Sequence, residues 1–386
     1  MVRHPTGVAE GRAGQAAPLT PSQARLLLSA EGRAAVARAQ GLDLPPIAAA
    51  EAMRPLGEVG RLALEQTALR RRALAKHPDG DRLWWTAEAL EQSTPRAVAL
   101  HHARRFDDAP RVLDLGCSVG GDLIAFGPRG IGVDLDLARC LLASANTGAP
   151  VACADVTRLE PRGWVFADPA RRTAGRRGFD PASWSPPLSQ VLSWDVDALG
   201  VKVAPGIDYD QLRADVEVEL VSLDGDVKEA MLWRGATRRG HRMTATVLPT
   251  GDQLVGVGAL APVGDVGRFL LEPDGAVIRA HLVAEVCDLV DGRLLDGTIA
   301  YVTADSAVPT PFGRWYEVLD VLPFSLKRLR ERLRGVGAVT IKKRGTAVEP
   351  EQLRRQLKLS GTGEATVVLT RARGTQIAIV VHPLPR

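Results

Sequence analysis

The fold is decided by the stretch VLDLGCSVGGD at residues 112–122 and by three similar runs that follow it. The later runs are IGVDLD at 131–136, VACADV at 151–156 and WVFADPARR at 164–172. Each begins with apolar residues, as a buried strand does, and each has an aspartate where the apolar residues end. Segments compatible with helices, such as 137–146, separate the runs. Strands that alternate with helices are typical of βαβ units, so the sequence predicts an α/β fold with a parallel sheet.

The first 108 residues carry no strand signal. Residues 1–18 are small, polar and aperiodic, which predicts a flexible tail. Residues 19–108 are expected to form a helical domain. Apolar positions at near-helical spacing predict one helix that begins at a Thr20 or Ser22 cap and continues to Ala37.

The α/β domain is expected to occupy residues 109–262. Strands in addition to the four runs are predicted at 199–203, 216–223, 228–233 and 256–260. Residues 263–386 are expected to form an α+β module, because the pattern after Pro323 alternates between helix, strand, helix and hairpin.

The composition excludes several classes of protein. Apolar residues make up 45% of the 386-residue chain, and no apolar run reaches the 18 residues of a membrane-spanning helix. The N-terminus lacks the apolar core of a signal peptide. The four cysteines show no C-x-x-C spacing and no histidine cluster, so neither a disulfide framework nor a metal site is indicated. A soluble, cytoplasmic protein without a membrane partner is expected.

The aspartates at the ends of the four runs are expected to meet at one ligand. The carboxyl ends of parallel strands lie at one edge of a sheet, where ligands bind. A single acidic residue after a strand is usually a helix cap, but four in succession indicate a binding site. The four are Asp114, Asp134, Asp155 and Asp168.

The first loop indicates what kind of ligand would bind. Its glycines do not match the G-x-G-x-x-G pattern of dinucleotide-binding loops, because Ser118 occupies the middle position. Asp114 and Asp122 would repel a pyrophosphate and attract an ammonium and a sulfonium group. Asp134 can accept hydrogen bonds from both ribose hydroxyls, and Asp155 from an adenine amine. Together these groups describe S-adenosylmethionine. The residues expected to bind it are Asp114, Gly116, Ser118, Gly120, Gly121, Asp122, Asp134, Leu135, Asp155 and Val156.

The four motifs, taken in order, resemble those of class I S-adenosylmethionine-dependent methyltransferases. The chain is also similar to a narrower group, bacterial methyltransferases of an actinobacterial type with a C-terminal THUMP-like domain. That resemblance rests on LWWT at 83–86, LEQST at 90–94, FADPARR at 166–172 and IKKRG at 341–345. It implies a Rossmann-like parallel-sheet methyltransferase core, an N-terminal helical domain and a C-terminal α+β THUMP-like domain.

The fourth run resembles the motif of enzymes that methylate exocyclic amines of bases. Those enzymes have an Asp or Asn, two prolines and an aromatic residue, and the first side chain accepts a hydrogen bond from the target amine. Asp168 and Pro169 match, whereas Ala170 and Arg171 replace the second proline and the aromatic ring. An arginine can stack on a base or bind a phosphate. The catalytic residues that the resemblance implies are Asp168, Pro169 and Arg171, and Arg172 is expected to contact nucleic acid.

The formal net charge of +4 is unevenly distributed along the chain. Residues 323–386 hold 14 Lys and Arg residues and four acidic residues, for a net charge of +10, and the remaining residues carry −6. A basic surface of this kind suits phosphate groups. THUMP domains as a class bind RNA, so the resemblance implies an RNA partner. Besides Arg172, the residues expected to bind it are Arg328, Arg332, Lys342, Lys343 and Arg344.

These patterns predict an S-adenosylmethionine-dependent methyltransferase that acts on a base nitrogen of structured RNA, either tRNA or rRNA. Two alternatives stay open. The acceptor could be a small molecule or a protein, or the chain could be a non-catalytic RNA-binding protein with a decayed methyltransferase fold. Ser118 and the incomplete motif at 168–171 favour decay, whereas the intact acids at all four strand ends argue against it.

Overall fold

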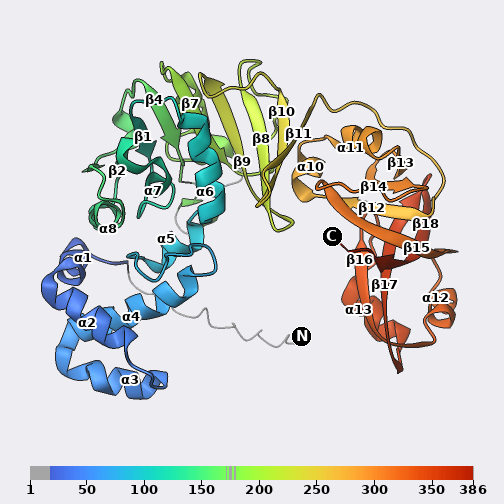
Figure 1. Cartoon of the computed structure of the whole chain (residues 1–386), viewed down its shortest axis with the longest axis horizontal. Coiled ribbons are helices and arrows are strands. Elements are labelled where there is room, and N and C mark those ends of the chain that lie inside the picture. The colour runs from blue at the N-terminus through green and yellow to red at the C-terminus, as the bar shows by residue number, and fades with distance from the viewer. Residues whose placement is uncertain (1–17, 171, 174–175, 178–179, 386) are drawn as a thin grey trace, which may run out of the picture. The chain divides into compact units, whose positions relative to one another are not determined.

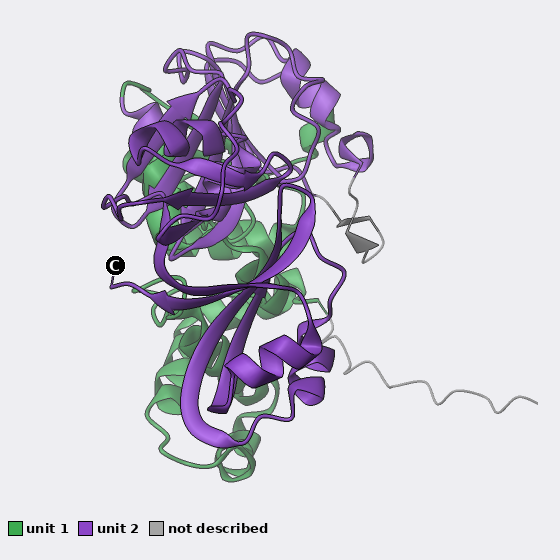
Figure 2. Cartoon of the chain, turned by 90° about the vertical axis from the view of Figure 1, so that its right-hand side faces the viewer, with its two compact units in different colours: residues 1–103, 108–159 green, residues 104–107, 160–386 purple. Residues whose placement is uncertain are grey.

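The structure is a computed structural model that describes residues 18–170, 172–173, 176–177 and 180–385. The chain divides into two compact units, one of residues 1–103 and 108–159 and one of residues 104–107 and 160–386 (Figure 2). The tail predicted at 1–18 lies outside the described residues, apart from Pro18. The predicted domain limits after residues 108 and 262 stay predictions.

The first unit begins with helices, as the sequence predicts (Figure 1). They are α1 (Pro21–Leu28), α2 (Ala30–Gln40), α3 (Pro46–Met53), the 3-10 turn η1 (Arg54–Leu56), α4 (Gly57–Ala73), α5 (Ala87–Gln92) and α6 (Arg96–Ala103). Thr20 caps α1, because its Oγ1 accepts a hydrogen bond from the Gln23 N–H at 3.2 Å while the Gln23 side chain accepts from the Thr20 N–H at 3.0 Å.

The prediction of one helix through Ala37 is wrong, because the chain breaks at Ser29. The Ser29 backbone is extended, and its Oγ accepts a hydrogen bond from the Gly32 N–H at 3.1 Å, which starts α2. The two helices meet so closely that a Cβ at Gly32 would lie 2.1 Å from the Leu26 carbonyl oxygen. The break therefore needs both a capping serine and a glycine.

The first unit also contains three parallel strands, which confirm the predicted βαβ pattern. The strands are β1 (Val112–Leu115), β2 (Gly130–Asp134) and β3 (Val151–Cys153), and they lie in the order β1-β2-β3. The segments between them are α7 (Leu123–Phe126), η3 (Gly127–Arg129) and α8 (Leu137–Thr147), and η4 (Val156–Arg158) follows β3. Asp136 caps α8 by accepting hydrogen bonds from the N–H groups of residues 138 and 139. Ala138 and Leu142 of α8 belong to the hydrophobic core of the N-terminal helices.

The second unit starts with the 3-10 turn η2 (Arg104–Phe106) and resumes with the fourth predicted strand. Its elements up to residue 256 are β4 (Trp164–Ala167), β5 (Arg172–Thr173), β6 (Arg176–Arg177), η5 (Pro181–Ser183), α9 (Leu188–Ser193), β7 (Ala198–Val203), β8 (Glu217–Leu223), β9 (Asp226–Gly235), β10 (Met243–Leu248) and β11 (Asp252–Gly256). Apart from the β5-β6 pair, these strands lie in the order β11-β10-β8-β9-β7-β4. β4 is parallel to β7, and β9 is antiparallel to both β7 and β8.

The strand predicted at 256–260 is wrong. β11 ends at Gly256, and the side chains of Val257 and Leu260 beyond it are 85% and 101% exposed. The apolar residues of this stretch therefore lie in an exposed loop. β10, with the sequence MTATVL, was not predicted, although its alternating β-branched residues favour a strand.

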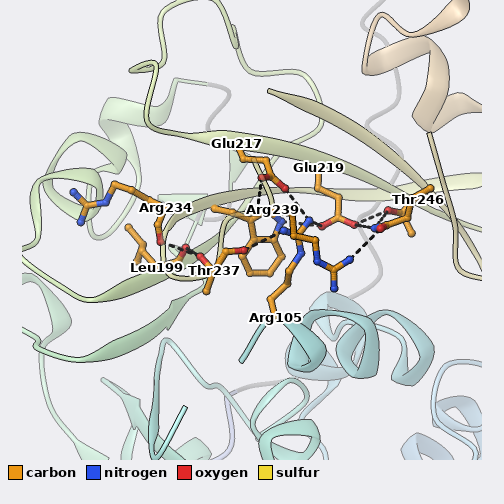
Figure 3. Close-up of polar contacts among 10 residues, drawn as sticks. Arg105, Leu199, Glu217, Glu219, Arg234, Thr237, Arg239 and Thr246 are labelled. Carbon is orange, nitrogen blue, oxygen red and sulfur yellow. Dashed lines mark hydrogen bonds and ion pairs between the residues drawn. The ribbon is translucent and has the colours of Figure 1, made fainter. Parts of the chain in front are cut away.

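One face of this sheet buries a network of charged and polar side chains (Figure 3). The Arg105 guanidinium lies 2.8 Å from Glu217 Oε1 and 3.1 Å from Glu219 Oε2, and all three side chains are buried. Glu219 also accepts hydrogen bonds from Trp233 Nε1 at 2.8 Å and from Thr246 Oγ1 at 2.5 Å. Buried charges are tolerated when they are paired and hydrogen-bonded in this way, so the network joins η2 to β8, β9 and β10.

The rest of the second unit is an α+β module, as predicted. Its elements are β12 (Phe269–Pro273), α10 (Gly275–Arg279), α11 (Val283–Leu289), β13 (Arg293–Asp296), β14 (Ile299–Ala304), β15 (Gly313–Pro323), α12 (Leu326–Arg332), β16 (Gly335–Lys343), α13 (Pro350–Leu357), β17 (Gly361–Ala372) and β18 (Thr375–Pro383). The strands lie in the order β13-β14-β12-β15-β18-β17-β16. Leu329 of α12 and Leu353 of α13 pack in one core with Ile341 and Val367 of the sheet. No helix in the described ranges is long and apolar enough to cross a membrane.

Candidate active site

The glycine-rich loop after β1 turns sharply and is fastened to β2. The N–H groups of Gly116 and Cys117 donate hydrogen bonds to the Val133 carbonyl at 2.8 and 3.1 Å. Gly116 and Gly120 both have φ of 90°, which glycine adopts without strain. Ser118, which occupies the middle glycine position, has φ of 51°, a left-handed conformation that is uncommon for serine.

Asp134 stabilises this loop and still has capacity to bind a ligand. Its Oδ2 accepts a hydrogen bond from the Ser118 N–H at 2.9 Å, and its Oδ1 accepts one from the Asp136 N–H at 2.9 Å. An ionised carboxylate can accept about four hydrogen bonds. The remaining lone pairs fit the predicted role of Asp134 toward two ribose hydroxyls, and the contact with Asp134 explains how Ser118 is held in its strained conformation.

The loop lies in a negative electrostatic environment. Asp114 is buried beneath it, and burial, together with the charges of Asp114 and Asp134, raises the pKa of the Cys117 thiol far above its ordinary value. Cys117 is therefore a small, buried, protonated residue and does not act as a nucleophile. The same potential favours a ligand that carries positive charge.

Asp122 has partners from the LEQST string. Its Oδ2 accepts a hydrogen bond from Thr94 Oγ1 at 2.8 Å, and its Oδ1 lies 3.4 Å from His102 Nδ1. All three side chains are buried. A Cβ at Gly121 would lie 3.7 Å from Ser93 Cβ, so the string borders the loop directly. Asp122 therefore joins the loop to α6 and the segment before it.

The LWWT string is also connected to the loop. Asn146 of α8 accepts a hydrogen bond from the Trp84 N–H at 2.7 Å and donates one to the Val119 carbonyl at 2.8 Å. Trp84 and Trp85 themselves are buried in the helical core, where they serve packing. Thus both strings that precede the sheet help to hold the glycine-rich loop.

The ends of β2 and β3 offer groups suited to an adenosine. Leu135, directly after Asp134, has a side chain that is 70% exposed, although it is large and apolar. Such a side chain can pack against the face of a base. Asp155 Oδ1 accepts hydrogen bonds from Thr157 N–H at 3.0 Å and Thr157 Oγ1 at 2.6 Å, and these bonds lower the pKa of Asp155. Asp155 is therefore ionised at neutral pH, and Val156 follows it in a buried position.

Asp168 follows β4 in the second unit and forms an ion pair that the sequence analysis did not predict. Its Oδ2 lies 2.5 Å from the Nζ of Lys202, which is on β7. The register of these parallel strands pairs Ala167 with Val201, so Asp168 and Lys202 are next in line on the same face. Lys202 is only 4% exposed, whereas the Asp168 side chain is 28% exposed. Pro169 is buried.

The other predicted residues of this motif cannot be placed. Arg171 lies outside the described residues, and so does the side chain of Arg172. Ala170 exchanges two backbone hydrogen bonds with Ser185, at 2.9 and 3.1 Å. The chain directly after Asp168 and Pro169 is therefore fastened to residue 185.

Most of the predicted RNA-binding residues in the C-terminal module have carboxylate partners. Arg332 pairs with Asp320 at 2.8 Å, Lys342 with Glu272 at 2.6 Å and Lys343 with Glu349 at 2.7 Å. Among the described residues, no carboxylate pairs with the other two. Arg344 stacks 4.7 Å above the ring of Tyr301, and Arg328 is exposed on α12. These carboxylates compete with phosphate groups for the three side chains, so the paired residues are weaker candidates than their number suggests.

Lys202 could have been found from the sequence. It interrupts the apolar strand ALGVKV at 198–203 and is one of only seven lysines in the chain. A lysine is almost never fully buried unless it is paired. The position of Lys202 inside an apolar strand therefore predicts an acidic partner. Thr94 and Asn146 gave no comparable signal, because a threonine after a helix and an asparagine within one do not stand out as a lysine does inside an apolar strand.

Comparison with known proteins gives a family and a fold. A family model described as THUMP domain-like matches residues 313–383. An uncharacterised S-adenosylmethionine-dependent methyltransferase of Mycobacterium tuberculosis, found in strains CDC 1551 and H37Rv, is 38% identical over 335 residues, which cover 80% of this chain and 92% of the relative. The crystal structure of a candidate methyltransferase from Porphyromonas gingivalis W83 matches with a TM-score of 0.68 and 22% identity, over 95% of both chains. That likeness supports the fold alone.

Proposed function

Because this chain belongs to the S-adenosylmethionine-dependent methyltransferases and has a C-terminal THUMP-like domain, we propose that it methylates a base nitrogen in structured RNA, either tRNA or rRNA. The observation that carries the RNA part is the net charge of +10 over residues 323–386, on the same chain as the acidic cofactor loop. A polyanionic acceptor and a cationic cofactor are attracted by opposite charges. An acidic loop for the cofactor and a basic segment for the acceptor therefore fit a protein that binds both.

The residues around the loop fit S-adenosylmethionine. The spare lone pairs of Asp134 suit the ribose, the exposed Leu135 suits the face of the adenine, and Asp155 suits its amine. The buried acids below the loop suit the positive charges of the amino-acid tail. When bound, the cofactor supplies a methyl group made electrophilic by its sulfonium.

In the proposed reaction Asp168 orients the acceptor. Its carboxylate accepts a hydrogen bond from the target amine, and the proton that the nitrogen loses when it is methylated passes to water. Lys202 favours the ionised form of Asp168 and fixes its direction, because an ammonium 2.5 Å away stabilises the negative charge. Catalysis then comes mostly from alignment and from preorganised charge.

Transfer of a tritiated methyl group tests the acceptor class. The full chain is incubated with labelled S-adenosylmethionine and with separate RNA, protein and small-molecule fractions of a cell extract. We expect label in RNA, and we expect Asp168→Ala to lose most of it while cofactor binding in calorimetry stays intact. Label only in protein or small molecules would refute the RNA proposal. Failure to bind the cofactor at millimolar concentration would refute the proposal that the chain is an active methyltransferase, and it would favour the alternative of a decayed fold.

A further inference from the structure

A second candidate site lies within the second unit, as a cleft of about 1380 Å³. Most of its lining comes from the loop after β7 at 205–210, the β8-β9 turn at 225–228 and α10 with the residues after it at 275–281. Arg242, Met243, Val257, Gly258 and Arg344 complete it. None of the residues predicted to bind the cofactor lines it. Pockets for drug-sized ligands measure about 300–1,000 Å³, so this cleft is large for a small molecule.

One side of the cleft is formed by a crossover connection that contains no helix. β7 and β8 are parallel to each other, since both are antiparallel to β9, and such strands are usually joined by a helix that covers the sheet. Here residues 204–216 make the connection as an irregular loop. Arg242 holds this loop by donating hydrogen bonds to four of its backbone carbonyls, at residues 209, 212, 213 and 216.

The C-terminal module supplies the other side of the cleft. α10 packs on the sheet so closely that a Cβ at Gly275 would lie 2.6 Å from a methyl carbon of Val227. This side is basic, because Arg279, His281 and Arg344 line the cleft. The loop side carries Asp208 and Asp210, and at the turn Asp226 lies 3.4 Å from Lys228.

The arginines on the basic side have neutral partners in the structure. Arg279 is exposed, and its Nη1 donates a long hydrogen bond of 3.4 Å to the Pro205 carbonyl. Arg344 donates to the Ala300 carbonyl and stacks on Tyr301. Among the described residues no carboxylate forms an ion pair with either one, in contrast to Arg332, Lys342 and Lys343. Their charges are therefore available to an anion.

A buried hydroxyl beside the cleft points to a polar ligand as well. Tyr209 lines the cleft and is 8% exposed, and within the described ranges no group forms a hydrogen bond with its hydroxyl. Burial raises the pKa of Tyr209 to about 12, so the hydroxyl stays a neutral donor. An unpaired buried hydroxyl costs free energy, which a ligand acceptor could recover.

We propose that this cleft binds a single-stranded segment of the RNA acceptor, with its phosphates at Arg279 and Arg344. The inference rests on the proposed function. A base must be unpaired before its edge can be methylated, and the space is too small for a duplex but large enough for several nucleotides of one strand. The acidic side suits the amino groups of bases, and the basic side suits the backbone.

Charge reversal in the cleft tests the proposal. Fluorescence anisotropy of the full chain measures binding to a labelled 12-nucleotide single-stranded RNA and to a 12-base-pair RNA duplex. The variant is Arg279→Glu, and the matched control is Arg238→Glu, an exposed arginine on the β9-β10 turn that does not line the cleft. Arg328→Glu tests α12 instead. Thermal melting and calorimetry with the cofactor verify that each variant is folded.

We expect Arg279→Glu to weaken binding of the single strand about tenfold and to make the slope of log K against log salt less steep by about 1. Arg238→Glu should change neither by as much. Equal effects of the two substitutions, a loss confined to Arg328→Glu, or tighter binding of the duplex would overturn the proposal that the cleft binds single-stranded RNA. None of these results would contradict the proposed function. A wild-type chain that binds the cofactor but neither RNA would overturn both.

Discussion

At the scale of single residues, Asp134 combines a structural and a binding role. The carboxylate that is expected to hold the ribose also accepts the Ser118 and Asp136 N–H groups. The loop conformation and the ligand site therefore depend on one side chain, and a substitution there removes both.

Asp134→Ala should weaken S-adenosylmethionine binding about a hundredfold or more, because hydrogen bonds to a charged group contribute about 1.5–3 kcal/mol each. Titration calorimetry measures the Kd. Asp136→Ala is the matched control, since it removes the cap of α8, which costs about 1 kcal/mol of stability, but no predicted cofactor contact. Equal Kd values for the two variants would contradict the role of Asp134.

Lys202 is predicted to position Asp168 without touching the cofactor. Lys202→Met should lower kcat of methyl transfer by at least about tenfold while the cofactor Kd stays unchanged, because the carboxylate loses the cation that fixes it. Lys202→Arg should restore part of the rate. An unchanged kcat, or a loss of rate explained by a lower melting temperature, would show that the pair is only structural.

The sequence predicts the aspartates of the candidate site but not the residues that pair with them. Each strand-end aspartate is visible in the sequence because it follows an apolar run. The pairing of Asp168 with Lys202 depends on strand register across 34 residues, and the pairing of Asp122 with Thr94 on how the preceding segment meets the loop. Lys202 is conspicuous in its apolar strand, but local patterns do not show which acid it pairs with, and they do not show the partner of Asp122. The predictions for Arg171 and Arg172 stay predictions.

At the scale of elements, local signals decided which segments were predicted well. The capping box at Thr20 and the apolar strand runs are short-range patterns, and the structure confirms them. The break at Ser29 was missed because leucines before it and alanines after it continue the helical pattern. β10 was missed although its alternating β-branched residues are a local signal for a strand. It pairs in parallel with β8, from which β9 separates it in the sequence, and in antiparallel with β11, which follows it directly.

The buried network of Figure 3 gives an element-level prediction. Arg105→Met leaves the carboxylates of Glu217 and Glu219 without their shared cation, and breaking a buried pair costs about 3–5 kcal/mol. Urea unfolding measures this loss. Arg239→Met is the control, because the Arg239 side chain is exposed and should contribute within about 0.5 kcal/mol. Similar losses for both would mean that Arg105 is not needed to balance these charges.

At the scale of the whole molecule, the basic charge is concentrated in residues 323–386, but fewer of these residues are available to phosphates than the net charge suggests. Three of the predicted RNA-binding residues are engaged with Asp320, Glu272 and Glu349. The net charge of +10 therefore overstates how many phosphates the module can neutralise. Composition gives the number of basic residues, whereas the tertiary structure shows which of them are free of carboxylate partners and can contact phosphates.

This difference can be measured as a salt dependence. Ten phosphate contacts to a single strand would give a slope of log K against log salt near −7, at about −0.7 per contact. We expect a clearly shallower slope from anisotropy titrations between 50 and 200 mM salt, roughly the range over which such slopes are resolved. A slope of −7 or steeper would mean that the internal ion pairs open when RNA binds.

The most direct test of the central claim uses RNA from a strain of the source organism that lacks this gene. Mass spectrometry of its nucleosides is compared with wild-type RNA, before and after incubation with the purified chain and S-adenosylmethionine. One methylated nucleoside should be missing from the mutant RNA, and the wild-type chain should restore it while Asp168→Ala should not. Identical nucleoside profiles in both strains, with no methyl group added in vitro, would contradict the account.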